Sequence, residues 1–204
     1  MLFNLFCDTK KQHLMCIEAL EKKDLSLIKK IEKQEKIIND DYYRIFRKIV
    51  YYFTTFNAYG TELRDLLSFS FIVNEIERIA DYAWNIAKFY KTEERFLPEV
   101  KILVSSWKKL INYFEEIEEI FKNPDLNKIE QNLEKEEKFD MNKVFENLEK
   151  LWEVKSALTF SRKNYYFFLQ FKFLSRSYER LTNILEYLLF KKSFFKFRDF
   201  QKNR

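Results

Sequence analysis

Three oxygen-bearing side chains, Glu77, Asp81 and Asn85, follow one another at intervals of four residues. On a helix this spacing places them on one face, one turn apart, and we call the set the oxygen ladder. Carboxylate and amide oxygens suit a hard or borderline cation such as Mg, Mn or Fe. The same pattern is typical of a solvated polar helix face, so the spacing alone leaves both interpretations open.

Three side chains cannot complete a coordination shell, so a neighbouring helix or water must supply further ligands. The helix predicted over 25–57 carries an apolar seam in which Glu35 is the only charged residue, and Glu32 lies close to it along the chain. Counting back along both helices from the turn between them places Glu35 level with the ladder. Glu35 and Glu32 are therefore further candidate ligands. The alternative is that Glu35 pairs with Lys11 or Lys88, since a buried carboxylate needs a partner.

The composition excludes several classes of site. The single glycine among 204 residues rules out phosphate-binding loops that need two or more glycines. The single histidine, His13, rules out His-rich zinc sites, and its place in an apolar seam favours a core residue over a ligand. No nucleophile–base pair is visible, so we expect neither an enzyme nor an organic cofactor. Cys7 and Cys16 are expected to be free thiols, and the net charge of +5 does not indicate nucleic acid.

Breaks in the chain are few, because it holds one glycine and two prolines. Only a few long helices fit so little backbone punctuation, and short connections between them give antiparallel neighbours. We therefore expect an all-α fold, with Gly60 capping the second helix. The predicted helices span 3–22, 25–57, 61–91, 98–122, 125–156 and 161–200. No segment holds the roughly 18 consecutive apolar residues typical of a membrane span, so we expect a cytoplasmic protein.

The chain carries an internal repeat. Seven seam positions of the 61–91 helix recur 102 residues later in the 161–200 helix, and Glu77-Arg78 recurs as Glu179-Arg180. This pattern indicates a duplicated three-helix unit. It predicts two tandem antiparallel three-helix bundles, over residues 1–93 and 97–204.

The second half holds a weaker counterpart of the ladder. Glu179, Asn183 and Tyr187 occupy the equivalent positions, and Glu136 is the acidic counterpart of Glu35. A neutral tyrosine is a poor ligand for a hard cation near pH 7, because its ordinary pKa is about 10. We therefore expect any metal to bind in the first half, with Glu179, Asn183 and Glu136 forming at most a weaker second site.

A longer stretch around the first ladder resembles a known family. Its residues are Glu62-Leu63-Arg64, followed by Asn74-Glu75-Ile76-Glu77-Arg78-Ile79-Ala80-Asp81-Tyr82-Ala83-Trp84-Asn85-Ile86-Ala87. They resemble the signature of PhoU proteins, which reads approximately D-L-R and then D-L-E-R-I-G-D-H-A-x-N-I-A. The resemblance covers residues 15–91 well and the second half weakly. Ala80 and Tyr82 depart from it, standing where the family has glycine and histidine.

The resemblance implies both a fold and a function. PhoU proteins are tandem three-helix bundles that regulate phosphate uptake, and many bind metal through ladders of this kind. It implies a non-catalytic, metal-binding regulator of phosphate uptake and phosphate-starvation signalling, with Fe, Zn, Mn or Mg as the metal. The implied partners are the ATPase subunit of a phosphate ABC transporter and a sensor histidine kinase. Membrane contact would come only through these partners, and a homo-oligomer is compatible with the pattern.

Two arginines stand at strong positions of the family signature. Arg64 and Arg78 therefore imply partner contact, and the alternative for Arg78 is an ion pair with Glu75 or Glu77 of its own helix. The alternative function for the whole chain is a metal-free helical adaptor with no link to phosphate. Residues 191–198 alternate basic and aromatic side chains, which predicts either a surface that contacts a membrane or transporter or a helix end that packs its phenylalanines on the bundle.

Overall fold

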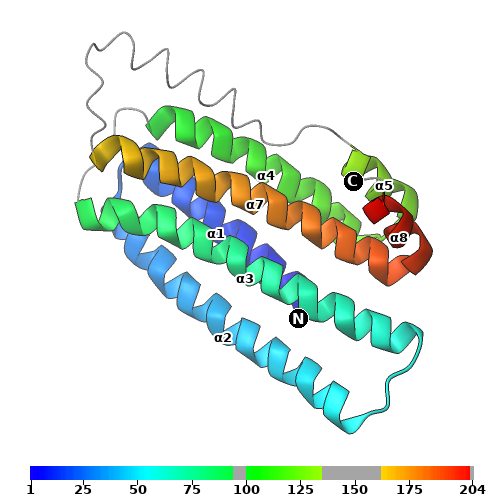
Figure 1. Ribbon diagram of the computed structural model, residues 1–204. Helices are drawn as coiled ribbons and strands as arrows, with labels where there is room; N and C mark the ends of the chain where they lie inside the picture. Colours follow the sequence, from blue (N-terminus) through cyan, green and yellow to red (C-terminus); the bar gives the residue numbers. More distant parts are fainter. Residues whose placement is uncertain (94–99, 135–161, 203–204) are drawn as a thin grey trace.

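The computed structural model describes residues 1–93, 100–134 and 162–202, and every element in these ranges is an α-helix (Figure 1). The expected all-α fold is confirmed. The described helices are α1 (Leu2–Lys22), α2 (Leu25–Thr55), α3 (Thr61–Glu93), α4 (Val100–Lys122), α5 (Leu126–Glu134), α7 (Arg162–Lys192) and α8 (Phe194–Lys202). Across these ranges, no helix has the length and apolar character needed to cross a bilayer.

Helix ends in the first half follow from local capping. Asp24 begins α2, where its side chain accepts a hydrogen bond from the Ser26 N–H at 2.7 Å. Lys23 ends α1 in the left-handed conformation at φ 54°, so this turn is made without a glycine. The prediction that Gly60 caps α2 is wrong: Phe56 is the cap residue in extended conformation, and Gly60, at φ 56°, lies directly before α3.

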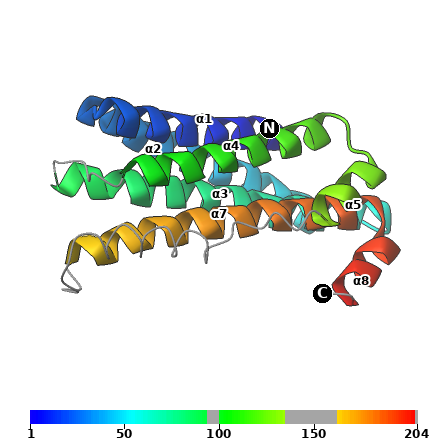
Figure 2. The same cartoon turned by 90° about the horizontal axis from the view of Figure 1, so that it is seen from above.

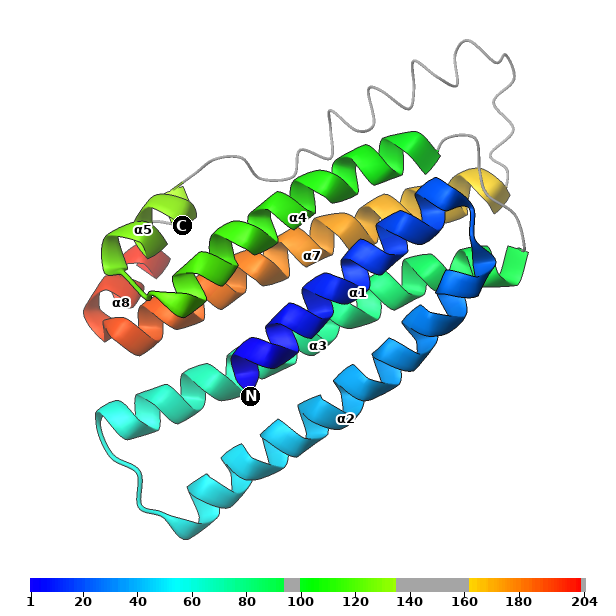
Figure 3. The same cartoon turned by 180° about the vertical axis from the view of Figure 1, so that it is seen from behind.

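The long helices α1, α2 and α3 form one antiparallel bundle, and α4 and α7 pack beside it (Figures 1, 2 and 3). The most extensive helix contact is between α3 and α7, which joins the two halves. Most positions of the two predicted seams are buried: Ile72, Ile76, Ile79, Ala83, Ile86 and Tyr90 on α3, and Phe171, Leu174, Leu181, Leu185 and Leu188 on α7. The seam positions Phe69 and Tyr178 are half-buried, and Lys192 at the end of α7 is exposed. The domain boundaries at 1–93 and 97–204 stay predictions.

The second half departs from prediction at its end. The helix expected over 161–200 is interrupted at Ser193, where α7 stops and α8 begins. The Ser193 hydroxyl accepts a hydrogen bond from the Lys196 N–H at 3.4 Å, so it caps the new helix. The Phe190 ring packs against Phe194 and Phe197, as expected if the basic-aromatic run folds onto the bundle. Of the helix expected over 125–156, only α5 lies within the described residues.

A buried hydrogen-bond chain ties three helices together. Trp107 of α4 donates its indole N–H to Nδ1 of His13 on α1 at 2.7 Å, so Nε2 of His13 carries the ring proton. That nitrogen lies 3.1 Å from the backbone oxygen of Ile79 on α3 and donates to it. All three residues are fully buried, and burial lowers the pKa of His13 to about 4. The expected core role of His13 is confirmed; we call this the His13 chain.

Candidate functional site

The predicted approach of α2 to the oxygen ladder centres on Glu35. Its side chain is 5% exposed, although Glu is among the residues least often buried in proteins. Oε2 accepts a hydrogen bond from Nε2 of Gln12 on α1 at 2.5 Å, and Oε1 accepts one from Nδ2 of Asn39 at 3.3 Å. The alternative of a pairing Lys11 or Lys88 is therefore not found, because the donors to Glu35 among the described residues are two neutral amides.

The charges around Glu35 are acidic. The pKa of Glu35 is raised to about 7, and burial is the largest cause. The carboxylates of Asp81 and Glu77 add to the rise, and the hydrogen bonds from the Gln12 and Asn39 amides oppose it. The pKa of Glu77 is also raised, first by burial and then by Asp81. Glu35 of α2 thus lies within electrostatic reach of the two ladder carboxylates of α3. We call Glu35, Glu77 and Asp81 the acidic cluster.

The acidic cluster has the oxygen chemistry of a hard-cation site, but its side chains are not arranged as one. Within the described residues, no group of three or more His, Cys, Asp or Glu side chains is placed to hold a metal ion. Both oxygens of Glu35 are engaged by amides, and Glu32 instead forms an ion pair with Lys91 at 2.7 Å. Asn85 is exposed at the far end of the ladder. Metal binding at these residues stays a prediction.

The weaker second site is not brought together among the described residues. Glu179 forms an ion pair with Arg176, one turn before it, at 2.6 Å. Asn183 points to α3, where its amide lies 3.4 Å from Glu75. Arg180 also reaches Glu75, with both carboxylate oxygens at 3.1 and 3.2 Å, so these residues join α7 to α3. Glu136 lies outside the described residues.

The two arginines predicted to contact partners have different surroundings. The side chain of Arg64 extends from α3 to α7, where its Nε donates a hydrogen bond to the backbone oxygen of Lys191 at 3.1 Å. It therefore satisfies a carbonyl at the end of α7, where a positive charge also suits the helix dipole. The Arg78 side chain is 61% exposed and lies 3.9 Å from Glu77, a loose ion pair within its own helix. Partner contact by Arg64 and Arg78 stays a prediction.

Residues 6–89 match the family model described as the PhoU domain. This part of the chain is a PhoU domain. The chain is also 39% identical over 93 residues to the phosphate-specific transport system accessory protein PhoU homolog of Borreliella burgdorferi. That match covers 45% of this chain and 42% of the relative, so the chain spans less than half the length of the curated relative that it matches.

Two solved PhoU structures share the fold of nearly the whole chain. The phosphate transport system regulatory protein PhoU of Streptococcus pneumoniae superposes with a TM-score of 0.78 at 17% identity, covering 94% of this chain and 91% of that one. PhoU of Pseudomonas aeruginosa gives a TM-score of 0.76 at 20% identity, covering 94% and 93%. At these identities the likeness shows the fold alone. The second half is thus PhoU-like in fold, while the PhoU domain of the first half contains the whole acidic cluster.

The raised pKa of Glu35 gives the PhoU domain a defined pH dependence. The unfolded chain releases this proton near the ordinary pKa of 4.5, whereas the folded chain holds it until about pH 7. Between these values the folded state binds more protons, so the free energy of unfolding falls as pH rises, by up to about 3 kcal/mol. Glu35→Gln cannot ionise and should lose this slope, becoming more stable than the unaltered chain above pH 7.

Urea unfolding at pH 5 and pH 8 measures the effect. Glu62→Gln is the matched control, since Glu62 is exposed at the start of α3 and its change should leave the slope as it is. Equal slopes for the Glu35→Gln variant and the unaltered chain would show that Glu35 is ionised in the folded protein at both pH values.

Proposed function

We propose that this chain regulates phosphate transport as a non-catalytic accessory protein, through contact with the phosphate transporter or its sensor kinase. The PhoU domain over residues 6–89, with its 39% identical relative named as a phosphate-transport accessory protein, is the observation that carries the proposal. The proposed partner is the ATPase subunit of a phosphate ABC transporter or a sensor histidine kinase. Its site of action is the cytoplasm.

The chemistry of the described side chains supports contact over catalysis. Both ring nitrogens of His13 are engaged within the core, and burial holds its pKa well below neutrality, so it cannot exchange protons with a substrate. Burial also raises the pKa of Cys16 far above its ordinary value, with the charge of Glu35 adding to the rise. The pKa of Cys7 is raised as well, so both thiols lack the thiolate character of a nucleophile.

Phosphate uptake in the native organism tests the proposal. Deleting the coding sequence should uncouple phosphate uptake, or a phosphate-starvation reporter, from the external phosphate concentration, and the intact chain supplied in trans should restore the response. Radiolabelled phosphate uptake at low and high external phosphate is the measurement. A response to phosphate that is unchanged by the deletion would contradict the proposal and favour an adaptor with no phosphate link.

Cation binding by the acidic cluster is the finer part of the proposed function. Its support is the spacing of the ladder and the approach of Glu35 to two further carboxylates. We expect the purified chain, equilibrated in turn with Fe, Zn, Mn and Mg, to retain one of them in elemental analysis. Glu77→Ala and Asp81→Ala should lose the bound metal, whereas Glu179→Ala, an exposed carboxylate on α7, should keep it. Absence of retained metal, or its loss in Glu179→Ala, would contradict this part and favour a metal-free regulator.

A further inference from the structure

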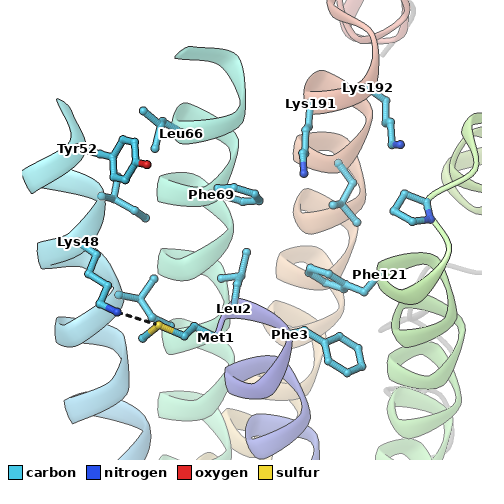
Figure 4. Close-up of a pocket in the computed structure, with 14 residues that line it drawn as sticks. Met1, Leu2, Phe3, Lys48, Tyr52, Leu66, Phe69, Phe121, Lys191 and Lys192 are labelled. Atoms are coloured by element: carbon cyan, nitrogen blue, oxygen red, sulfur yellow. Dashed lines mark hydrogen bonds between the residues drawn. The ribbon is translucent and has the colours of Figure 1, made fainter. Parts of the chain in front are cut away.

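The helices around α1 continue past its first residue. Lys48 of α2 lies beside Met1, with Nζ 3.4 Å from the methionine sulfur. From this level α2 runs on to Thr55 before the chain turns back into α3. At 1.5 Å per residue, α2 therefore extends about 10 Å beyond α1. Figure 4 shows Met1, Leu2 and Phe3 at the lower end of this region, with α2, α3 and α7 continuing past them.

An open pocket of about 600 Å³ occupies the space beyond α1, and we call it the end groove. Its walls are mainly apolar, with Ile49 and Tyr52 from α2, Leu66 and Phe69 from α3, and Leu188 from α7. The side chain of Tyr52 is 52% exposed, and its ring continues to Phe56, 50% exposed, at a centroid distance of 4.8 Å. Apolar surface is thus left uncovered along the end groove and past it.

The shape of the end groove is that of a missing helix segment. Three of the helices at the end groove, α2, α3 and α4, also contact α1, and α4 lines the groove through Phe121. One turn farther along α1, Leu5 and Phe6 are buried. The trough is therefore one helix wide, and a second helix placed end to end with α1 would cover the same walls. Amphipathic helices bind such grooves through apolar side chains spaced at i, i+3 or i+4, and i+7.

The rim of the end groove is basic. Lys48, Lys191 and Lys192 line it, and both Lys48 and Lys192 are exposed. Lys191 lies over the Phe69 ring at 4.5 Å and 3.9 Å from Asp65, so its charge is partly compensated. Within the described residues, Lys48 and Lys192 have no acidic partner, and Lys48 Nζ lies beside the Met1 sulfur. These two ammonium groups, on the α2 and α7 walls, favour a ligand with acidic side chains on both flanks of its apolar face.

We propose that the end groove binds a short, acidic amphipathic helix of a partner protein, which lies end to end with α1. The proposal deepens the proposed function, since that partner would belong to the phosphate-transport machinery. The one-helix width argues for a helix, and the paired lysines argue for Glu or Asp on its two edges.

Three peptides of about 14 residues probe the end groove of the purified full chain. The first has leucines at i, i+3, i+4 and i+7 with flanking glutamates, the second replaces each glutamate with lysine, and the third scrambles the first. We expect fluorescence anisotropy to show saturable binding of the first alone. The charge-reversal pair Lys48→Glu with Lys192→Glu should weaken it roughly tenfold or more. The pair Lys30→Glu with Lys172→Glu, exposed on the same two helices, should leave binding unchanged.

The apolar wall has its own matched pair. Tyr52→Ala should weaken peptide binding, whereas Tyr43→Ala, at an exposed position of the same helix outside the end groove, should not. Absence of saturable binding of the acidic peptide, or equal binding of the lysine peptide, would overturn the proposal. Two other results, each without acidic-peptide binding and each abolished by the Lys48→Glu and Lys192→Glu pair, would also overturn the proposal. Concentration-dependent dimerisation would favour a second copy of the chain as the occupant, and binding to anionic vesicles would favour a lipid surface.

Peptide binding to the purified chain does not depend on the phosphate response of the cell. If the chain binds the acidic peptide but its deletion leaves phosphate uptake unaffected, the groove proposal is supported and the proposed function is contradicted. If the chain controls phosphate uptake but does not bind the peptide, the proposed function is supported and the groove proposal is contradicted.

Discussion

The position of α1 is fixed by the His13 chain, and the acidic cluster and the end groove both depend on that position. A buried imidazole is tolerated when it is neutral and both its nitrogens are hydrogen-bonded, as they are here to Trp107 and Ile79. Because these partners come from α4 and α3, sliding α1 along its axis would break both bonds in the core. Such a shift would leave buried polar groups unpaired, which is costly. The His13 chain joins α1 and α3 of the first half of the chain to α4 of the second half. The α3–α7 contact and the Glu75–Arg180 ion pair join these two halves at another place.

Two features follow from where α1 is held. Gln12, the residue before His13, faces Glu35 and provides a neutral donor to it. Over the part of the chain that the structure describes, no cation compensates the carboxyl group of Glu35. At the other end of the helix, α1 begins level with Lys48 and leaves the apolar trough beyond it uncovered. One region is acidic and mostly shielded, and the other is basic, apolar and open.

Much of the fold could be predicted from the sequence because its determinants are local. A single glycine, two prolines and Asp24 restrict where helices end, and the seam around Ile76 and Ile79 has helical spacing. The interruption at Ser193 was missed, since the basic and aromatic residues around it keep a helical period and only the serine hydroxyl marks a cap. The break between residues 22 and 25 was predicted, whereas the conformation that makes it was not, because a left-handed lysine has no sequence signature.

The candidate site was harder to predict because its contacts join different helices. The spacing of α2 correctly indicated that Glu35 is buried and close to the ladder, yet spacing cannot tell which residue of α1 faces it. Lys11 or Lys88 was the alternative partner for Glu35, and a glutamine amide of α1 is found. The repeat likewise placed Asn183 in a second ladder, whereas its amide turns to Glu75 across the α3–α7 interface. That partner is 108 residues away along the chain, and the repeat relates Asn183 to Asp81, not to Glu75.

The His13 chain can be tested directly, because His13 is the only histidine in the protein. Nitrogen-15 NMR of the imidazole, recorded across pH, reports both the tautomer and the pKa from a single residue. The account predicts a neutral ring with its proton on Nε2, and signals that stay unchanged from pH 7.5 to about pH 5, consistent with a pKa of about 4. A proton on Nδ1, or a titration near the ordinary value of about 6.5, would show that the His13 chain does not hold α1 in place.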